Sequence, residues 1–105
     1  MDAKLKELII LLDEIESLLQ AYHHQNWKNA VSTIKLRLQN QDTSALKDYL
    51  DYFRGMGSLN DITFYDSSKN GESLFNKDNS QKYYSLSSLS FSLAKEIMQS
   101  IEEGL

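Results

Sequence analysis

Few side chains in this sequence could do acid–base or metal chemistry, and those that could are adjacent to one another. The two histidines, His23 and His24, are neighbours, and neighbouring side chains on a helix point in different directions. A zinc site needs three or four converging ligands, and no Glu lies three or four residues from either histidine. The carboxylate pairs Asp13-Glu14 and Glu102-Glu103 diverge for the same reason, and the chain has no cysteine. We therefore expect no catalytic residue, no metal site, no cofactor and no enzyme.

A second candidate for chemistry is the stretch Gly55-Met56-Gly57-Ser58-Leu59-Asn60-Asp61. Two glycines one residue apart could form a phosphate loop, but such a loop follows a strand and opens a helix. Here a helical pattern comes first and no Lys-Ser or Lys-Thr follows. The spacing therefore favours a helix stop and a sharp turn, in which Met56 and Leu59 dock into the core. Asn60 and Asp61 then supply caps and turn bonds.

The elements that must position these residues are mainly helices. Apolar residues recur at steps of three and four along most of the chain, which is typical of amphipathic helices. The expected helices cover residues 2–22, 26–39, 43–54 and 80–103. Asn26, Asp42 or Thr43, and the run 78–80 are the expected caps of the last three. The predicted fold is all-α, a compact bundle of about four helices.

Residues 62–78, between the third and fourth helices, are expected to form an arm. Asn70-Gly71 is a strong hairpin dipeptide, so a hairpin could pair residues 62–65 with residues 73–75. An irregular arm pinned by Phe64, Leu74 and Phe75 is an equally good interpretation. Long loops in compact domains are often functional. The arm, with Phe64, Tyr65, Asp66 and Phe75, is therefore a candidate for partner contact.

Two patterns on the outer helices leave alternatives open. The run 8–12 is apolar most of the way round, so either the first helix is covered on two sides, or Ile10 or Leu11 is left for a partner. The last helix has an apolar seam, Tyr83, Leu86, Leu89, Leu93, Ile97 and Ile101. Ser85, Ser88 and Ser92 line another face, which is either solvated or closely approached by another helix.

Asp13, Glu14 and Glu16 make the second half of the first helix negative. The second helix is positive through Lys28, Lys35 and Arg37, so the two could face each other in an antiparallel hairpin. Exposed pairs of this kind contribute only about 0–1 kcal/mol each. The alternative is that the three acidic residues meet a basic partner.

Length and charge narrow the possible partners. The 105 residues fit one domain, 1–105, and the net charge of −4 disfavours a nucleic-acid binder, which usually carries a basic face. No apolar run reaches membrane-spanning length, and the first residues lack the order of a signal peptide. We therefore expect a cytoplasmic protein that binds neither membrane nor nucleic acid.

The stretch 55–61 resembles the G-M-G-S-hydrophobic-N-D signature of a family of small bacterial helical proteins without an assigned activity. Trp27, at the start of the second helical segment, and residues 94–97 extend the likeness. Proteins of this kind resemble immunity proteins encoded beside bacterial toxins. The resemblance implies a protein that binds and neutralises a cognate toxin, which could itself be basic. The alternative is a homo-oligomeric helical adaptor, for instance a homodimer.

Overall fold

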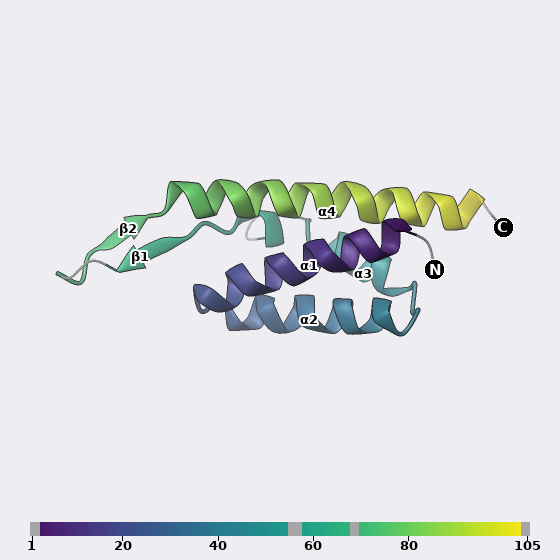
Figure 1. Cartoon of the computed structure of the whole chain (residues 1–105), viewed down its shortest axis with the longest axis horizontal. Helices are drawn as coiled ribbons and strands as arrows, with labels where there is room; N and C mark the ends of the chain where they lie inside the picture. Colours follow the sequence, from purple (N-terminus) through teal and green to yellow (C-terminus); the bar gives the residue numbers. More distant parts are fainter. Residues whose placement is uncertain (1–2, 55–57, 68–69, 104–105) are drawn as a thin grey trace.

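A computed structural model describes residues 3–54, 58–67 and 70–103. Most of this described part is helical (Figure 1). Its elements are α1 (Ala3–Ala21), α2 (Gln25–Gln39), α3 (Ala45–Asp51), the 3-10 helix η1 (Leu59–Asp61), β1 (Tyr65–Ser67), β2 (Ser73–Phe75) and α4 (Lys77–Glu103). The expected helical bundle with an arm between the third and fourth helices is confirmed. The third helix is shorter than expected, because Tyr52 and Phe53 form turns instead of continuing it.

Helix α1 is the central layer of the bundle, with α2 packed on one side and α4 on the other (Figure 1). Its buried residues repeat at alternating steps of three and four, so one stripe serves both neighbours. They are Leu5, Leu8, Leu12, Ile15 and Leu19. The expectation that this helix is covered on two sides is confirmed. Ile10 nevertheless remains 62% exposed, so part of the apolar run 8–12 faces solvent.

The buried seam of α4 differs from the expected apolar one. Its fully or almost fully buried residues include Ser80, Tyr83, Ser87, Ser90, Ala94 and Ile97, together with Leu86 at its edge. These positions keep a strict three–four spacing, and that spacing carries small residues into the interface. Leu89, which was expected in the seam, is 58% exposed, and Ile101 is exposed as well. Small side chains at the contact leave room for the neighbouring helices. The position of a residue on the helix, rather than its hydrophobicity, therefore decides which residues of α4 are buried.

Two tyrosines bring hydroxyl groups into the core, and each finds a partner. Ser90 donates to the carbonyl of Ser87 at 2.7 Å, so the 2.6 Å contact between Tyr49 and Ser90 has the tyrosine as donor. Tyr83 donates to the carbonyl of Leu59 at 2.7 Å, which ties η1 to α4. Burial raises the pKa of both phenols, so they stay neutral. Helix α4 is thus joined to α3 and to η1 by hydrogen bonds as well as by packing.

The helix starts differ from the expected caps. Helix α4 begins at Lys77, three residues early, because Asn76 Oδ1 accepts the N–H of Asn79 at 2.8 Å and caps the helix. Helix α2 follows His24, which makes no side-chain capping bond, so Asn26 is not its cap. Asp42 does serve the turn before α3, where its Oδ1 accepts the N–H of Ser44 at 3.1 Å.

The hairpin is real, but its first strand lies further along the chain than expected. Strand β1 pairs with β2 in antiparallel register, with Tyr65 opposite Phe75 and Ser67 opposite Ser73. Residues 62–64 are not part of the pair, because Phe64 turns into the core. The arm extends past the ends of α1 and α2 and gives the molecule dimensions of 57 × 23 × 21 Å (Figure 1). Over the described ranges, no helix has the length and apolar content needed to cross a membrane.

Candidate functional site

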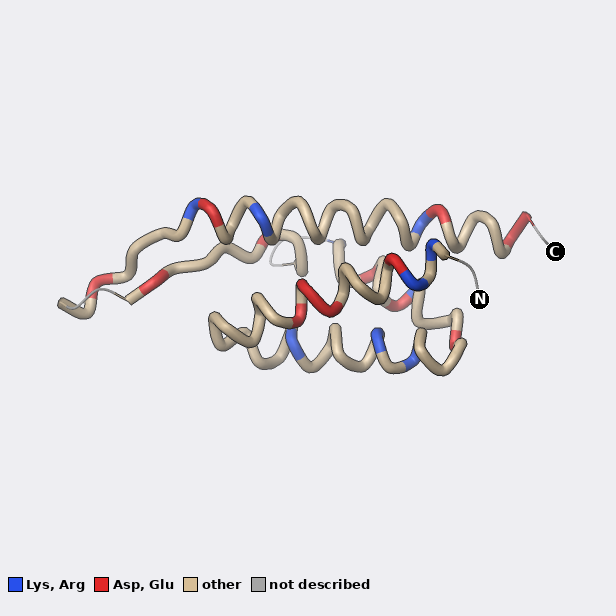
Figure 2. The backbone as a smooth tube through the Cα atoms, viewed as in Figure 1, with Lys and Arg blue, Asp and Glu red and all other residues tan. Residues whose placement is uncertain are grey.

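The acidic residues of α1 face the basic residues of α2, as expected for an antiparallel hairpin (Figure 2). Lys35 Nζ lies 3.0 Å from Asp13 Oδ1 and 3.2 Å from Glu16 Oε1. Ser32, one turn away on α2, donates a hydrogen bond to the other oxygen of Glu16. Hydrogen bonding to Asp13, with a further contribution from Glu16, raises the pKa of Lys35. Asp13 and Glu16 are therefore engaged within the bundle.

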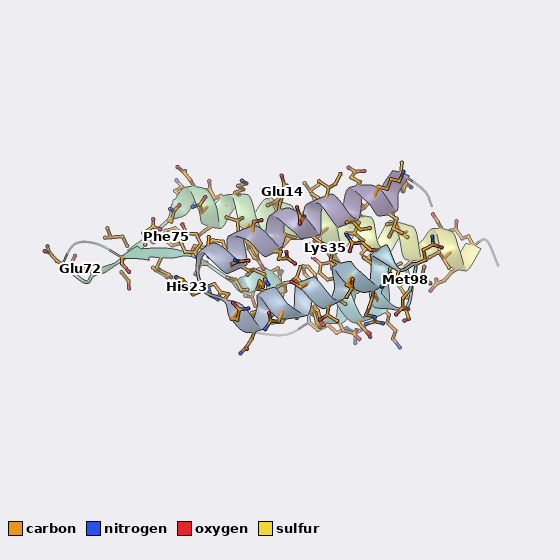
Figure 3. The ribbon with its side chains drawn as sticks, turned by 60° about the horizontal axis from the view of Figure 1, so that its bottom comes forward. Glu14, His23, Lys35, Glu72, Phe75 and Met98 are labelled. Carbon is orange, nitrogen blue, oxygen red and sulfur yellow. The ribbon has the colours of Figure 1, made fainter. Side chains whose placement is uncertain are left out.

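Glu14 is different from its two acidic neighbours. It is exposed, and Figure 3 shows it pointing out from α1. A partner that used this surface would meet Glu14 directly, whereas it would have to compete with Lys35 for Asp13 and Glu16. Of the three acidic residues predicted to bind a partner, only Glu14 is presented without an ion pair among the described residues.

The hairpin arm carries the largest exposed side chains that lie together. Tyr65, Leu74 and Phe75 are 55%, 51% and 54% exposed. In this register Tyr65 and Phe75 share one face, where their ring centroids are 5.7 Å apart, while Leu74 and Asp66 share the other. All six strand residues are exposed. Both faces of the arm are therefore open (Figure 3).

Phe64 was predicted to contact a partner, but it is fully buried. Its ring stacks on Tyr22 at a centroid distance of 4.4 Å and meets the edge of Tyr83 at 5.1 Å. Its backbone is also fixed, because the N–H donates to Ser80 Oγ at 2.9 Å and the carbonyl accepts the N–H of Asn76 at 2.8 Å. Phe64 is the anchor of the arm, since an aromatic ring in a core site gains more from burial than it could at an exposed position.

At the base of the arm, Asn76 joins the hairpin to α4. Besides capping the helix through Oδ1, it donates from Nδ2 to Asp66 Oδ2 at 2.7 Å. Beside this bond lies a hollow of about 440 Å³ between the arm and the end of α1. Two of the predicted contact residues, Tyr65 and Asp66, line it. We call this space the arm-base hollow; the sequence did not reveal it.

Residues 55–61 behave as a turn where the structure describes them. Gly55, Met56 and Gly57 lie outside the described residues. Ser58 donates to Asn60 Oδ1 at 2.7 Å and lies 3.3 Å from Asp61 Oδ2, so these polar groups bond within the turn, as expected. Leu59 is fully buried, which confirms its expected docking into the core.

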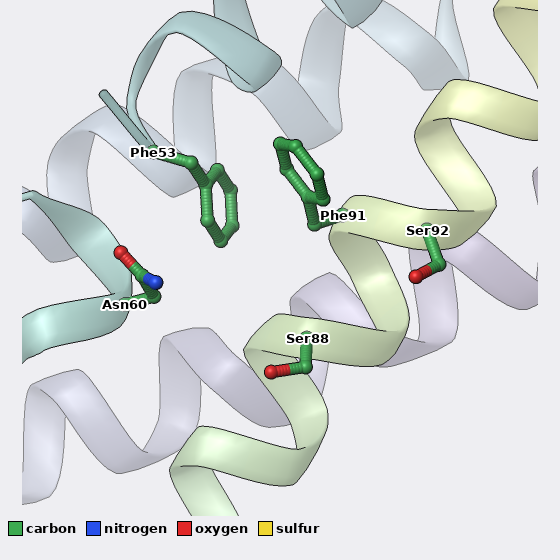
Figure 4. A pocket seen from close by; sticks show the side chains of 5 residues that line it. All are labelled: Phe53, Asn60, Ser88, Phe91 and Ser92. Atoms are coloured by element: carbon green, nitrogen blue, oxygen red, sulfur yellow. The ribbon is translucent and has the colours of Figure 1, made fainter.

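A second hollow, of about 350 Å³, lies between this turn and α4 (Figure 4). The rings of Phe53 and Phe91 meet there at 4.9 Å, and Asn60, Ser88 and Ser92 complete its lining. This lining holds an amide and two hydroxyls, which form hydrogen bonds but do not transfer protons at neutral pH. The two histidines lie at the α1–α2 turn instead. Among the described residues, no group of three His, Cys, Asp or Glu side chains is placed to hold a metal ion.

The comparisons with known proteins place the chain in a family. The family model described as a domain of unknown function (DUF6966) matches residues 13–72, from the second half of α1 to the residue before β2. Comparison with curated proteins and with solved structures found no match. The matched residues make up more than half of the 105-residue chain, so the chain belongs to the family described as a domain of unknown function, DUF6966.

Proposed function

We propose that this chain is an immunity-type protein, which binds a cognate protein toxin and blocks it by surface complementarity. The observation that carries the proposal is the arm, where Tyr65, Leu74 and Phe75 are exposed on a hairpin that projects from the bundle. A two-stranded hairpin is marginal by itself in water, and apolar surface gains about 25 cal/mol per Å² when it is covered. A partner that covers the arm would supply this stabilisation.

The charge of the chain supports a basic partner. The net charge is −4, and acidic residues occur on the arm and on α1 (Figure 2). Asp66 and Glu72 lie on the arm itself, and Glu14 projects from α1. Complementary fields steer two proteins together and raise the rate of association more than the final affinity. An acidic inhibitor would therefore find a basic toxin quickly.

An inhibitor of this kind needs no chemistry of its own. It needs a stable scaffold and a projecting element with a few large anchors, which dominate binding at most interfaces. The bundle is the scaffold in this proposal, and the arm is the element that enters or covers the functional cleft of the toxin. Inhibition then follows from occupancy of the cleft.

Co-purification with the product of an adjacent gene tests the proposal. The tagged chain is co-expressed with that protein, and both recovery of the complex and growth of the host are measured. We expect a stable complex and rescue of growth from a toxic partner. The double substitution Tyr65→Ser with Phe75→Ser should abolish both. Tyr84→Ser with Leu36→Ser is the matched control, because these side chains are equally exposed but lie away from the arm.

Loss of the complex in the control as well as in the arm variant would contradict the assignment to the arm. Failure of every neighbouring gene product to co-purify with the wild-type chain would overturn the immunity proposal itself.

A second candidate function is a homodimeric adaptor, and a groove between α1 and α4 favours it. This groove of about 180 Å³ is lined by Leu11, Leu89 and Leu93, together with Glu7, Ser92 and Glu96. Light scattering over a concentration series distinguishes the two candidates. A dimer that Leu89→Lys dissociates would support the adaptor, whereas a monomer at all concentrations would remove it.

A further inference from the structure

The arm-base hollow is lined by apolar, aromatic and polar or charged residues together. Leu18, Ala21, Tyr22 and His23 from the end of α1 line it, together with Tyr65, Asp66 and Ser67 of β1 and Asn79 of α4. The hollow measures about 440 Å³, within the roughly 300–1,000 Å³ of typical ligand pockets. It has room for one long side chain from another molecule.

The polar and aromatic groups of the hollow are held in place before anything binds. The ring of Tyr22 stacks on the buried Phe64, and its hydroxyl accepts a hydrogen bond from Asn79 Nδ2 at 2.7 Å. Asp66 is fixed through Oδ2 by Asn76. Groups that are already ordered lose little conformational entropy on binding, so such a site binds more tightly than the same groups on a mobile loop.

The carboxylate of Asp66 keeps capacity for another donor. Oδ2 accepts the amide of Asn76, while Oδ1 has no hydrogen-bond partner within residues 3–54, 58–67 and 70–103. A carboxylate in the same hollow as the ring of Tyr22 matches a guanidinium, which donates to oxygen in its plane and stacks on rings through its faces. The apolar part suits the methylene stem of the same side chain.

We propose that the arm-base hollow receives an arginine side chain of the partner protein. The inference rests on the proposed function for the source of the arginine, and it identifies what the acidic arm recognises. Tyr65 lines the hollow, and its ring forms the exposed pair with Phe75 on the face of the hairpin opposite to Asp66. The arginine would therefore be bound next to the apolar contact that the arm makes.

The test uses a small probe and needs no toxin. N-acetyl-arginine amide is titrated into the full chain at pH 8, where histidines are ordinarily uncharged, and binding is followed by amide chemical shifts in NMR. N-acetyl-citrulline amide, which has nearly the same shape without the charge, is the matched probe. We expect saturable shifts at Tyr22, Tyr65 and Asp66 with the arginine probe, and at least fivefold weaker binding of the citrulline probe.

Two variants test which side chains of the hollow contribute to binding of the arginine probe. Asp66→Asn should weaken arginine binding about tenfold, because it removes a charge-assisted hydrogen bond. Tyr22→Leu should weaken it about two- to fivefold through loss of the cation–π contact. Glu103→Gln is the matched control, since it removes the same charge from an exposed residue at the far end of α4 and should leave binding unchanged.

The outcomes separate this inference from the proposed function. Equal binding of the two probes, shifts scattered over the acidic surface, or an effect of Glu103→Gln as large as that of Asp66→Asn would overturn the arginine site. A toxin complex that needs Tyr65 and Phe75 but tolerates Asp66→Asn would also overturn it, while the immunity proposal stands. Specific arginine binding without any co-purifying toxin would support the site and remove the immunity proposal.

Discussion

The bundle and the arm use the same residue types in opposite ways. Inside the bundle every buried side-chain nitrogen or oxygen of the described residues has a hydrogen-bond partner, and Tyr49 and Tyr83 direct their hydroxyls to acceptors in the core. On the arm, Tyr65 and Phe75 point to solvent. The core aromatic side chains of the bundle thus contact other parts of the chain, whereas those of the arm are exposed. Stability should therefore depend on the one and recognition on the other.

The largest expected effect compares two phenylalanines, one in each region. Phe64→Ala leaves a cavity beside Tyr22 and Tyr83 and should lower the free energy of unfolding by about 3–5 kcal/mol. Phe75→Ala makes the same chemical change at an exposed site and should cost less than about 1 kcal/mol. Urea denaturation of both variants gives the comparison. Equal losses would show that the arm is as integral to the fold as the core.

The next effect tests the buried hydroxyls. Ser90→Ala leaves the hydroxyl of Tyr49 buried without an acceptor and should cost about 1–3 kcal/mol. Adding Tyr49→Phe removes the unsatisfied group, so the double variant should recover part of the loss. The measurement is a double-mutant cycle by urea denaturation. Strictly additive losses would argue against a direct bond between the two side chains.

A pH series should distinguish the two regions as well. Burial raises the pKa of Tyr49 and Tyr83, so in the folded state they keep their protons after an unfolded tyrosine, with a pKa of about 10, has lost its own. Their stabilisation is thus full below about pH 10 and falls above it, by roughly 1 kcal/mol per pH unit for each phenol. Hydrogen bonding to Asp13 raises the pKa of Lys35, so this residue also contributes to the loss of stability at high pH.

Urea denaturation between pH 8 and pH 11 measures this loss. Tyr83→Phe should reduce the slope above pH 10, whereas Tyr65→Phe removes an exposed phenol of the arm and should keep the wild-type slope. A stability that is flat up to pH 11 would contradict the burial of the two phenols.

The smallest effect concerns the arm surface itself. Tyr65→Ser with Phe75→Ser should change the free energy of unfolding by no more than about 0.5 kcal/mol for each residue, because both side chains are exposed. The same variant is expected to abolish partner binding. A large loss of stability would mean that the two rings support the bundle, and the separation of roles between the regions would then be wrong.

The helices of the bundle could be predicted from the sequence, because apolar residues at steps of three and four indicate a long amphipathic helix. The stripe of α1 and the facing of Asp13 and Lys35 follow directly from this spacing. The seam of α4 was misjudged, since the prediction followed apolar residue types to Leu89. Strict three–four spacing from Tyr83 would instead have found Ser87 and Ser90.

The arm was harder to predict, since its structure depends on contacts distant in sequence. Phe64 is buried by Tyr22 and by residues of α4, none of which a local pattern connects to it. Because Phe64 is buried in the core, the strand begins at Tyr65, and Phe64 is not exposed to a partner. The arm-base hollow arises the same way, from α1, β1 and α4 together. No local sequence signal marks it.

The bonds of Asn76 determine which changes in chain length the molecule can absorb. Its side chain and backbone together contact Phe64, Asp66, Asn79 and Ser80. One residue inserted between Asn76 and Ser80 would rotate the rest of α4 by about 100° and turn its seam away from α1. Insertions next to Gly71, at the far end of the hairpin, would leave these bonds intact. A change in length at this tip would therefore alter the reach of the arm without rebuilding the bundle.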